Sequence, residues 1–488
     1  MVSPEEKDKP MNKHLNLING AWVGETFRPN INPSDTNDII GHYASGSATE
    51  TEAAISAAVD AFAGWSRTLP IERHTILKAA AAEIFARREE LGKLLAREEG
   101  KSVGEAIGEA TRAAQIFDFY AAECLRLSGE MLESVRPGIG VEITREPLGP
   151  IGLITPWNFP IAIPAWKLAP ALAYGNTVVM KPADLVPGCA WELAAILHRA
   201  GLPAGVLNLV MGSGSTVGQT MLDSPRLRAI SFTGSTGVGQ RVAESSARLG
   251  RRCQLEMGGK NPLVVLDDAD METALDCAIQ GSFFSTGQRC TASSRLIVTA
   301  GIHDAFVAAL AERVGALRVG AALDPQTQIG PVVNLDQLEQ DLRYIEIGKA
   351  EGADLLVGGT RLNRDTPGFY MAPAIFANAT NAMRIAREEI FGPVACVIKA
   401  ADYDEALAIA NDTEFGLSAG ICTQSLAKAA HFKRNAQAGM VMVNLPTAGV
   451  DFHVPFGGTK ASSIGSREQG SYAREFFTTV KTSYVKAG

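Results

Sequence analysis

The segment from Gly149 to Leu249 alternates short apolar runs with helix-forming stretches, and this alternation restricts the possible folds more than any other feature of the sequence. The apolar runs have the length of fully buried strands and cover residues 151–154, 177–180, 206–210 and 229–232. The helical stretches between and after them cover residues 164–173, 189–200 and 238–249. Strands that alternate with helices predict an α/β fold with a parallel, doubly wound sheet, whose ligands bind at the carboxyl ends of the strands.

Further units flank this sheet in the sequence. Periodic segments rich in Ala, Leu and Glu predict helices over residues 49–64, 71–99 and 111–127. Alternating patterns predict hairpins at 15–24 and 135–146 and an edge strand at 474–482. A second α/β unit is expected from Arg295 to about Val450. Because 488 residues exceed a single hydrophobic core, we expect two or three domains.

Charge, cysteine content and hydropathy exclude several classes of protein. A net charge of −8 without basic clusters does not fit nucleic-acid binding. Seven cysteines without CxxC spacing fit neither a disulfide framework nor a zinc site. No apolar run approaches the roughly 18 residues of a membrane span, and Met1–Pro10 has no apolar core of a signal peptide. We therefore expect a cytoplasmic protein without a metal, nucleic-acid or membrane partner.

Polar residues follow the first two predicted strands. Asn158, in Thr155-Pro156-Trp157-Asn158-Phe159-Pro160, is predicted to cap a helix that has Pro160 in its first turn. One face of that helix, suited to core packing or to a pocket wall, carries Phe159, Ala162, Ile163 and Trp166. The second strand is followed by Lys181-Pro182-Ala183-Asp184. A lysine and an acid there can hold ribose or phosphate, although such a lysine is often only solvated.

Two glycine-rich loops follow the third and fourth predicted strands, at 212–218 and 232–239. The second opens a helix, so its N–H groups and the positive end of the helix dipole can meet a pyrophosphate. Neither loop matches the G-x-G-x-x-G pattern, and a single loop of this kind is more often a tight turn.

Two reactive side chains come next along the chain. Cys290 follows Gly287-Gln288-Arg289 and precedes small polar residues, so nothing bulky in the sequence crowds its sulfur. A cysteine is nevertheless usually a small buried hydrophobe. Glu256 precedes the Gly258-Gly259 break, and a carboxylate there can equally be a surface residue beside a turn.

Six motifs occur in the order that is typical of one family, so that the chain resembles the aldehyde dehydrogenase superfamily over nearly its whole length. The motifs are Pro156-Trp157-Asn158-Phe159-Pro160, Lys181-Pro182-Ala183, Phe232-Thr233-Gly234-Ser235, Leu255-Glu256-Met257-Gly258-Gly259-Lys260-Asn261-Pro262, Gly287-Gln288-Arg289-Cys290 and Glu389-Ile390-Phe391-Gly392-Pro393. More narrowly, residues 450–458 followed by Ser466-Arg467-Glu468-Gln469-Gly470 are similar to the α-ketoglutaric semialdehyde dehydrogenases.

The resemblance implies an aldehyde dehydrogenase-like fold of three domains. A Rossmann-like domain for NAD(P) would comprise residues 12–128 and 147–256, and an α/β catalytic domain residues 257–455. A small β extension for oligomerisation would comprise residues 129–146 and 470–488, giving a homodimer or a homotetramer.

The resemblance also implies NAD(P)-dependent oxidation of an aldehyde to a carboxylic acid. Cys290 would add to the aldehyde to give a thiohemiacetal, because hydride transfer from a trigonal carbonyl is difficult. Asn158 and the backbone N–H of Cys290 would stabilise the oxyanion. Glu256 would activate the water that hydrolyses the resulting thioester.

NADP or NAD is the cofactor that the resemblance implies. The residues assigned to it are Thr155, Pro156, Trp157, Lys181, Ala183, Asp184, Gly214, Gly218, Thr233, Gly234, Ser235, Met257, Glu389 and Phe391. Many NAD-preferring members carry Glu at the position of Asp184, and the shorter Asp leaves more room for a 2′-phosphate. We therefore expect both cofactors to be accepted, with NADP at least competitive.

The expected substrate is 2,5-dioxovalerate (α-ketoglutaric semialdehyde), which would give 2-oxoglutarate; succinic semialdehyde or another small aldehyde is the alternative. Arg289 can bind a substrate carboxylate, or equally the protein's own acids and backbone. A cysteine-dependent ester or thioester hydrolase is the candidate from a different class, but it would have no use for two dinucleotide loops. The residues assigned to the substrate are Phe159, Ala162, Ile163, Trp166, Arg289, Thr291, Val450 and Phe456.

Overall fold

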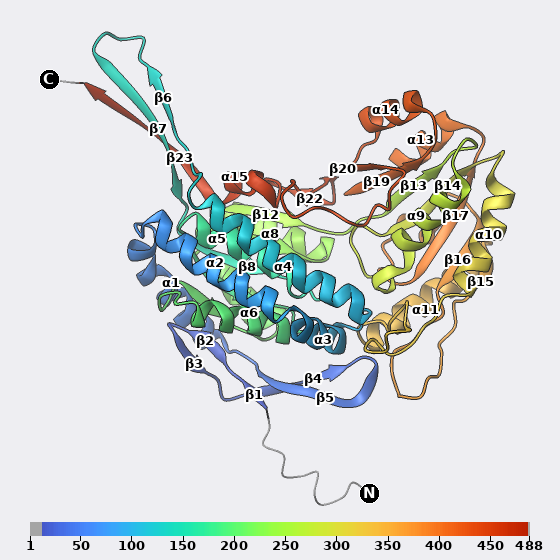
Figure 1. Ribbon diagram of the computed structural model, residues 1–488, viewed down its shortest axis with the longest axis horizontal. Helices are drawn as coiled ribbons and strands as arrows, with labels where there is room; N and C mark the ends of the chain where they lie inside the picture. The colour runs from blue at the N-terminus through green and yellow to red at the C-terminus, as the bar shows by residue number, and fades with distance from the viewer. Residues whose placement is uncertain (1–11, 487–488) are drawn as a thin grey trace, which may run out of the picture.

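A computed structural model describes residues 12–486, which form two α/β lobes and a projecting β-sheet (Figure 1). The first lobe is built on an eight-stranded sheet in the order β22-β12-β11-β8-β9-β10-β2-β3. Its strands from β12 to β10 run parallel, and antiparallel strands close both edges. The bounds are β2 Asn16–Ile18, β3 Ala21–Val23, β8 Pro150–Ile154, β9 Thr177–Lys181, β10 Leu207–Leu209, β11 Ala229–Thr233, β12 Arg252–Glu256 and β22 Ser463–Ile464.

Helices cover both faces of this sheet, as a doubly wound fold requires. The largest hydrophobic core of the molecule lies between the sheet and helices α2, α4, α5 and α6, with buried side chains from each. The helices of this lobe are α1 Ala48–Trp65, α2 Pro70–Ala86, α3 Arg88–Glu99, α4 Val103–Glu123, α5 Ala162–Ala173, α6 Gly188–Arg199, α7 Gln219–Asp223 and α8 Thr236–Arg248, with a π-helical turn at Gly214–Gly218.

The second lobe is built on a seven-stranded sheet in the order β15-β16-β17-β14-β13-β19-β20. Separate hydrophobic clusters line its two faces. The strands are β13 Asn261–Val265, β14 Ser293–Thr299, β15 Asp354–Val357, β16 Ala374–Ala379, β17 Val394–Ala400, β19 Ser418–Cys422 and β20 Met440–Val443. The helices are α9 Met271–Phe283, α10 His303–Gly315, α11 Leu335–Ala350, α12 Arg384–Arg387, α13 Tyr403–Asn411 and α14 Leu426–Asn435, with a 3-10 turn at Phe284–Gly287.

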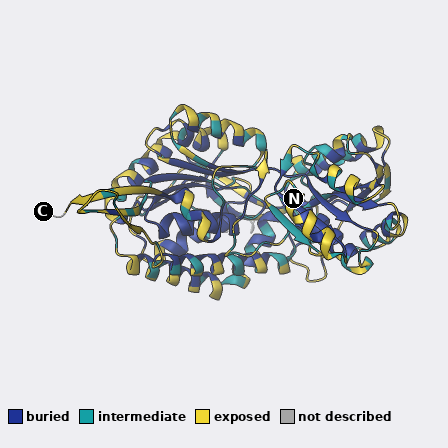
Figure 2. Ribbon diagram, turned by 90° about the horizontal axis from the view of Figure 1, so that it is seen from above, coloured by how far each residue is buried: buried dark blue, intermediate teal, exposed yellow. Residues whose placement is uncertain are grey.

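Three small sheets complete the described part of the chain. The projecting sheet has the order β23-β7-β6, so the C-terminal strand pairs with β7. The hairpin predicted within 135–146 is formed by β6 and β7, and its first strand lies before the predicted residues. Figure 2 shows the two large sheets as buried layers and many exposed residues on this projection. The remaining elements are β1 Lys13–His14, β4 Phe27–Asn32, β5 Asp35–Ala44, β6 Glu130–Glu133, β7 Ile139–Pro147, β18 Phe415–Gly416, β21 Thr459–Lys460, a 3-10 turn at Gly470–Ala473, α15 Arg474–Phe477 and β23 Thr478–Lys486.

The fold class predicted from the sequence is confirmed, and so are most of its elements. α9 begins at Met271 because Asp270 caps it by accepting from the Thr273 N–H at 2.9 Å. The four buried strands and three helices predicted between residues 149 and 249 are all present, and their ends differ from the predicted ends by only a few residues. The domain boundaries stay a prediction. The segment Met1–Pro10, on which the expectation about a signal peptide was based, lies outside the described residues.

Several local predictions are wrong. The helix expected over 71–99 is two helices that meet at Arg87. The helix expected from Thr111 begins earlier, at Val103, and its first turns also bury small apolar residues, among them Ala106 and Ala110. Asn158 is no helix cap: α5 begins at Ala162, after Ile161. The predicted strand over 474–482 begins as a helical turn and becomes a strand only at Thr478.

Among residues 12–486, no helix is long and apolar enough to cross a membrane.

Candidate active site

The carboxyl ends of the first sheet form one wall of a cavity of about 360 Å³. β8 ends just before Thr155 and β11 ends at Thr233, and the cavity lies between these ends and the second lobe. The rings of Trp157 and Phe391 meet edge to face across it, with centroids 5.3 Å apart. Its lining consists of Pro156, Trp157, Asn158, Ile163, Thr233, Gly234, Ser235, Met257, Gly258, Cys290, Gln337, Gln340, Glu389 and Phe391.

Polar groups left without partners in this region fit a dinucleotide. The N-cap of α8 is Ser235, whose side chain does not bond the first N–H groups of the helix. The hydroxyls of Thr155 and Thr233 are buried and have no partner among the described residues. Free N–H and O–H donors at a helix N-terminus suit the oxygen atoms of a pyrophosphate.

The predicted ribose-binding group lies at the end of β9, outside that cavity lining. The Lys181 ammonium is almost fully buried, and its Nζ donates to the Pro182 carbonyl at 2.8 Å. Burial lowers the pKa of Lys181, and nearby Asp184 partly opposes this. Gly218 lies beside the lysine side chain. Ala183 precedes Asp184 in the same loop, and Gly214 begins the π-helical turn that ends at Gly218.

A residue that the sequence did not predict joins this group. Arg28 of β4 lies with its Nη1 3.8 Å from Asp184 Oδ2. β4 belongs to the N-terminal sheet β1-β5-β4, and residues 28 and 184 are far apart in the sequence, so a local sequence pattern cannot predict this ion pair.

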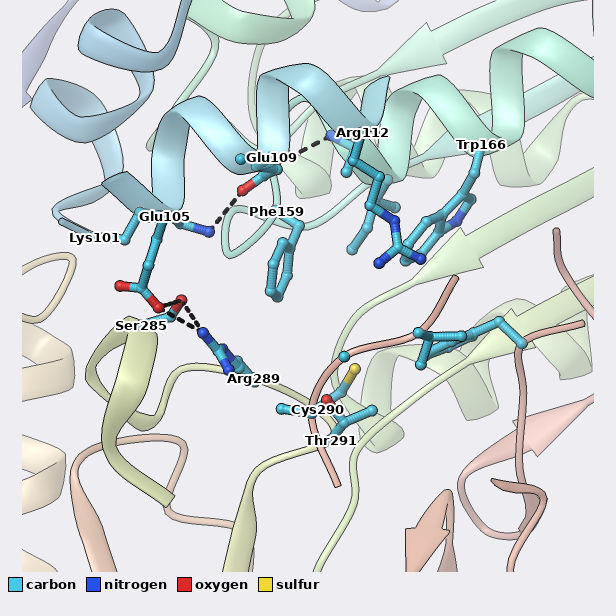
Figure 3. Close-up of a pocket in the computed structure, with 17 residues that line it drawn as sticks. Lys101, Glu105, Glu109, Arg112, Phe159, Trp166, Ser285, Arg289, Cys290 and Thr291 are labelled. Atoms are coloured by element: carbon cyan, nitrogen blue, oxygen red, sulfur yellow. Dashed lines mark hydrogen bonds and ion pairs between the residues drawn. The ribbon is translucent and has the colours of Figure 1, made fainter. Parts of the chain in front are cut away.

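A second cavity, of about 280 Å³, approaches Cys290 from the opposite side, and Cys290 and Ile163 line both cavities (Figure 3). The structure brings together in this lining all eight residues assigned to the substrate: Phe159, Ala162, Ile163, Trp166, Arg289, Thr291, Val450 and Phe456. The additional lining residues are Lys101, Glu105, Gly108, Glu109, Arg112, Ser285, Ala448 and Gly449.

The additional residues from α4 carry a signal that sequence reasoning missed. Glu105, Glu109 and Arg112 are spaced i, i+4 and i+7, which places them on one helical face. Glu105 and Glu109 precede the helix predicted from Thr111, so the predicted helix does not include them.

Cys290 follows a strained turn that fixes its position. Ser285 and Thr286 adopt left-handed backbone angles, with φ of 51° and 57°. Asn261 Nδ2 donates to the Cys290 carbonyl at 2.7 Å. Burial raises the pKa of the Cys290 thiol to about 12, and the carboxyl groups of Glu389 and Glu256 add to the shift.

Asn158 lies opposite this turn. Its side-chain Nδ2 donates to the backbone carbonyl of Gln288 at 3.0 Å, and its backbone carbonyl accepts from Lys101 Nζ at 2.7 Å. A primary amide has two N–H groups, so one donor stays available for the cavity that Asn158 lines.

Glu256 is the last residue of β12 and lines neither of the two cavities. Ser463 Oγ donates to its carboxyl group at 2.5 Å. Burial raises the pKa of Glu256 well above its usual range, and the nearby carboxyl group of Glu468 raises it further. Glu468 in turn forms a buried ion pair with Lys167.

Nearly the whole chain matches known proteins. Residues 22–483 match the aldehyde dehydrogenase family. An α-ketoglutaric semialdehyde dehydrogenase from Bacillus subtilis is 45% identical, over 97% of this chain and 98% of that protein. A 2,5-dioxopentanoate dehydrogenase from Saccharolobus solfataricus is 42% identical, over 95% of this chain and 97% of that protein.

A solved structure shares the fold over the same length. The betaine aldehyde dehydrogenase from Staphylococcus aureus, in complex with NAD+, superposes with a TM-score of 0.95 at 34% identity and covers 97% of this chain and 95% of that chain. The chain therefore belongs to the aldehyde dehydrogenase family and is an NAD(P)-dependent oxidoreductase that acts on aldehydes.

Proposed function

We propose that the aldehyde which this enzyme oxidises is 2,5-dioxovalerate and that the product is 2-oxoglutarate. The observation that carries the proposal is the second cavity, which reaches Cys290 and combines apolar walls with arginine side chains. A short aldehyde with a carboxylate at its other end suits such a cavity. The names of the relatives from Bacillus subtilis and Saccharolobus solfataricus support the same substrate.

We propose that NAD(P) lies in the cavity at the strand ends of the first lobe. When bound, it supplies the nicotinamide ring that accepts a hydride from the substrate carbon. The N–H groups at the start of α8 and the hydroxyl of Ser235 would hold the pyrophosphate. Lys181 and Asp184 would hold the adenosine ribose, and Glu389 and Phe391 would lie at the nicotinamide end.

Cys290 and Asn158 would perform the first chemical step. The Cys290 sulfur, once deprotonated, forms a bond to the carbonyl carbon, and the electron pair of the C=O bond moves to the oxygen. The free N–H of the Asn158 amide and the backbone N–H of Cys290 would donate to that oxyanion. Removal of one such donor typically slows catalysis by about 10²- to 10³-fold.

Glu256 would act as the general base for hydrolysis of the thioester. Because Ser463 holds its carboxyl group outside both cavities, the side chain has to rotate to reach water beside Cys290. Burial and the neighbouring Glu468 raise the pKa of Glu256, so its carboxyl group loses its proton only at a higher pH than an ordinary glutamate, and a base must be ionised. Turnover is therefore expected to increase as the pH rises.

A substrate panel tests the proposal. Cofactor reduction is followed with 2,5-dioxovalerate, succinic semialdehyde, glycolaldehyde, betaine aldehyde and pentanal, each with NAD and with NADP. The proposal requires the highest kcat/KM for 2,5-dioxovalerate. A higher value for another aldehyde would reject the substrate, and ester hydrolysis without any cofactor reduction would favour the hydrolase.

We also propose that the protein works in the reducing environment of the cytoplasm. All seven cysteines are free thiols in the structure, including five that are buried.

A further inference from the structure

Five charged side chains line the cavity that approaches Cys290, and four of them neutralise one another in pairs (Figure 3). Lys101 Nζ lies 2.7 Å from Glu109 Oε2. Arg289 Nη2 lies 2.5 Å from Glu105 Oε1 and 3.0 Å from Ser285 Oγ. Arg289, which the sequence offered as a ligand for a substrate carboxylate, thus already has a carboxylate of the protein.

The fifth side chain, Arg112, has no acidic partner among the described residues. Its Nη2 donates to Gln469 Oε1 at 3.0 Å, which is a neutral acceptor. Its Nε is buried and has no hydrogen-bond partner within residues 12–486. The guanidinium also lies 5.9 Å from the ring of Trp166. Glu109, one turn away on α4, is occupied by Lys101 and by the backbone N–H groups of residues 161 and 162.

Arg112 is half-buried, and a guanidinium removed from part of its water without an opposite charge beside it is destabilised where its surroundings are apolar. Burial lowers the pKa of Arg112, and the negative charges of Glu109 and Asp451 partly oppose this shift. The rest of the wall around Arg112 includes Trp166 and Phe456, which screen charge poorly. A carboxylate that enters this space finds one uncompensated positive charge, and the planar fork of arginine matches the two oxygen atoms of a carboxylate.

The C-terminal segment holds Arg112 in place. Gln469 belongs to the Ser466–Gly470 motif and adopts a left-handed φ of 61°. The carbonyl of the next residue, Gly470, accepts from Tyr120 Oη at 2.9 Å, which ties this segment to α4. The motif that resembles α-ketoglutaric semialdehyde dehydrogenases therefore contacts the arginine directly.

We propose that Arg112 determines substrate specificity by binding the carboxylate of an aldehyde acid, so that the aldehyde group lies over Cys290. This inference rests on the proposed function, and it names the residue that selects acids over neutral aldehydes. Figure 3 shows the Arg112 side chain reaching from α4 into the cavity beside Trp166, with Cys290 and Arg289 across the cavity.

The first test compares acids with a neutral aldehyde. Arg112→Met keeps much of the side-chain volume and removes the charge. We expect kcat/KM for 2,5-dioxovalerate and succinic semialdehyde to fall by about 10- to 100-fold, the range for a lost hydrogen bond to a charged group. The loss should appear mainly in KM, while kcat/KM for pentanal stays within about twofold. Arg112→Lys should recover part of the loss, because it keeps the charge without the fork.

The matched control is Arg434→Met, which removes an exposed arginine from α14 in the other lobe. It should leave all the rates unchanged. If Arg112→Met lowers the rate for pentanal as much as that for the acids, the residue is only structural and the inference fails.

The second test needs neither cofactor nor turnover. Binding of glutarate is measured by calorimetry to Cys290→Ser and to Cys290→Ser/Arg112→Met. We expect at least tenfold weaker binding to the double variant, and equal affinities would overturn the inference. If the unmodified enzyme instead oxidises no aldehyde acid, the proposed function fails, and this binding comparison still decides the role of Arg112.

Discussion

Cys290 is protonated in the cofactor-free enzyme at neutral pH, because burial and nearby carboxyl groups raise its pKa to about 12. Below that pKa the thiolate fraction grows tenfold for each pH unit. We therefore predict that the rate of inactivation by iodoacetamide increases about tenfold per unit from about pH 7 to pH 9. Cys290→Ser lacks the thiol, so treatment with iodoacetamide should leave its cofactor binding unchanged. A rate that levels off near neutral pH would show that the thiol is already activated.

Arg28 places a positive charge beside the expected ribose site. It lies 3.8 Å from Asp184, whose negative charge would otherwise repel a 2′-phosphate. We predict that Arg28→Ala lowers kcat/KM for NADP by about tenfold, as expected for one lost charged contact, and changes the value for NAD by less than twofold. The exposed Arg434 is again the matched control. Equal losses with both cofactors would contradict a role in 2′-phosphate binding.

At the scale of elements, the loop that leads into α4 supports the loop that carries Asn158. Lys101 is buried, and its Nζ contacts Glu109 and the Asn158 carbonyl, each at 2.7 Å, and lies 3.8 Å from Glu99. Burial raises the pKa of Glu99 to about 8, although Lys101 opposes the shift. The single ammonium group therefore stabilises two buried acids and one turn of the active site.

We predict that Lys101→Met lowers the free energy of unfolding by about 3–5 kcal/mol, because it leaves the buried Glu109 carboxylate without its cation. Thermal melting followed by fluorescence measures the loss. Lys93→Met, which changes an exposed lysine of α3, should melt like the unmodified protein. Adding Glu109→Gln to Lys101→Met should restore part of the stability. An unchanged melting temperature for Lys101→Met would show that this buried pair contributes little.

At the scale of the whole molecule, the projecting sheet β6-β7-β23 exposes large apolar side chains, among them Met131, Val480 and Tyr484. Apolar groups gathered on a projection typically mark an interface. We predict that the protein forms a homodimer or homotetramer through this sheet and that Val480→Asp lowers the mass measured by light scattering. Leu426→Asp, at an exposed leucine of α14, should not change the mass. A monomeric unmodified protein would refute the prediction.

The same scale explains how the two cavities meet. The strand ends of the first lobe provide Asn158, and the turn after α9 of the second lobe provides Cys290. Neither lobe alone encloses the sulfur, so the site depends on how the lobes are joined.

The sequence alone determined the order of strands and helices, because the buried face of each element requires apolar residues at a regular spacing along the chain. Capping residues such as Asp270 set boundaries in the same local way. The motif residues that line the two cavities could also be named, since they follow predicted strands or precede the reactive cysteine.

Only the tertiary structure decided which charges are compensated. Arg289 meets Glu105 across 184 positions of sequence, and Arg112 meets Gln469 across 357. Arg28 reaches Asp184 from another sheet. Such pairs depend on how the folded elements pack against one another. The sequence shows that a residue is charged, but it does not show whether an acid, an amide or a cavity lies beside that charge.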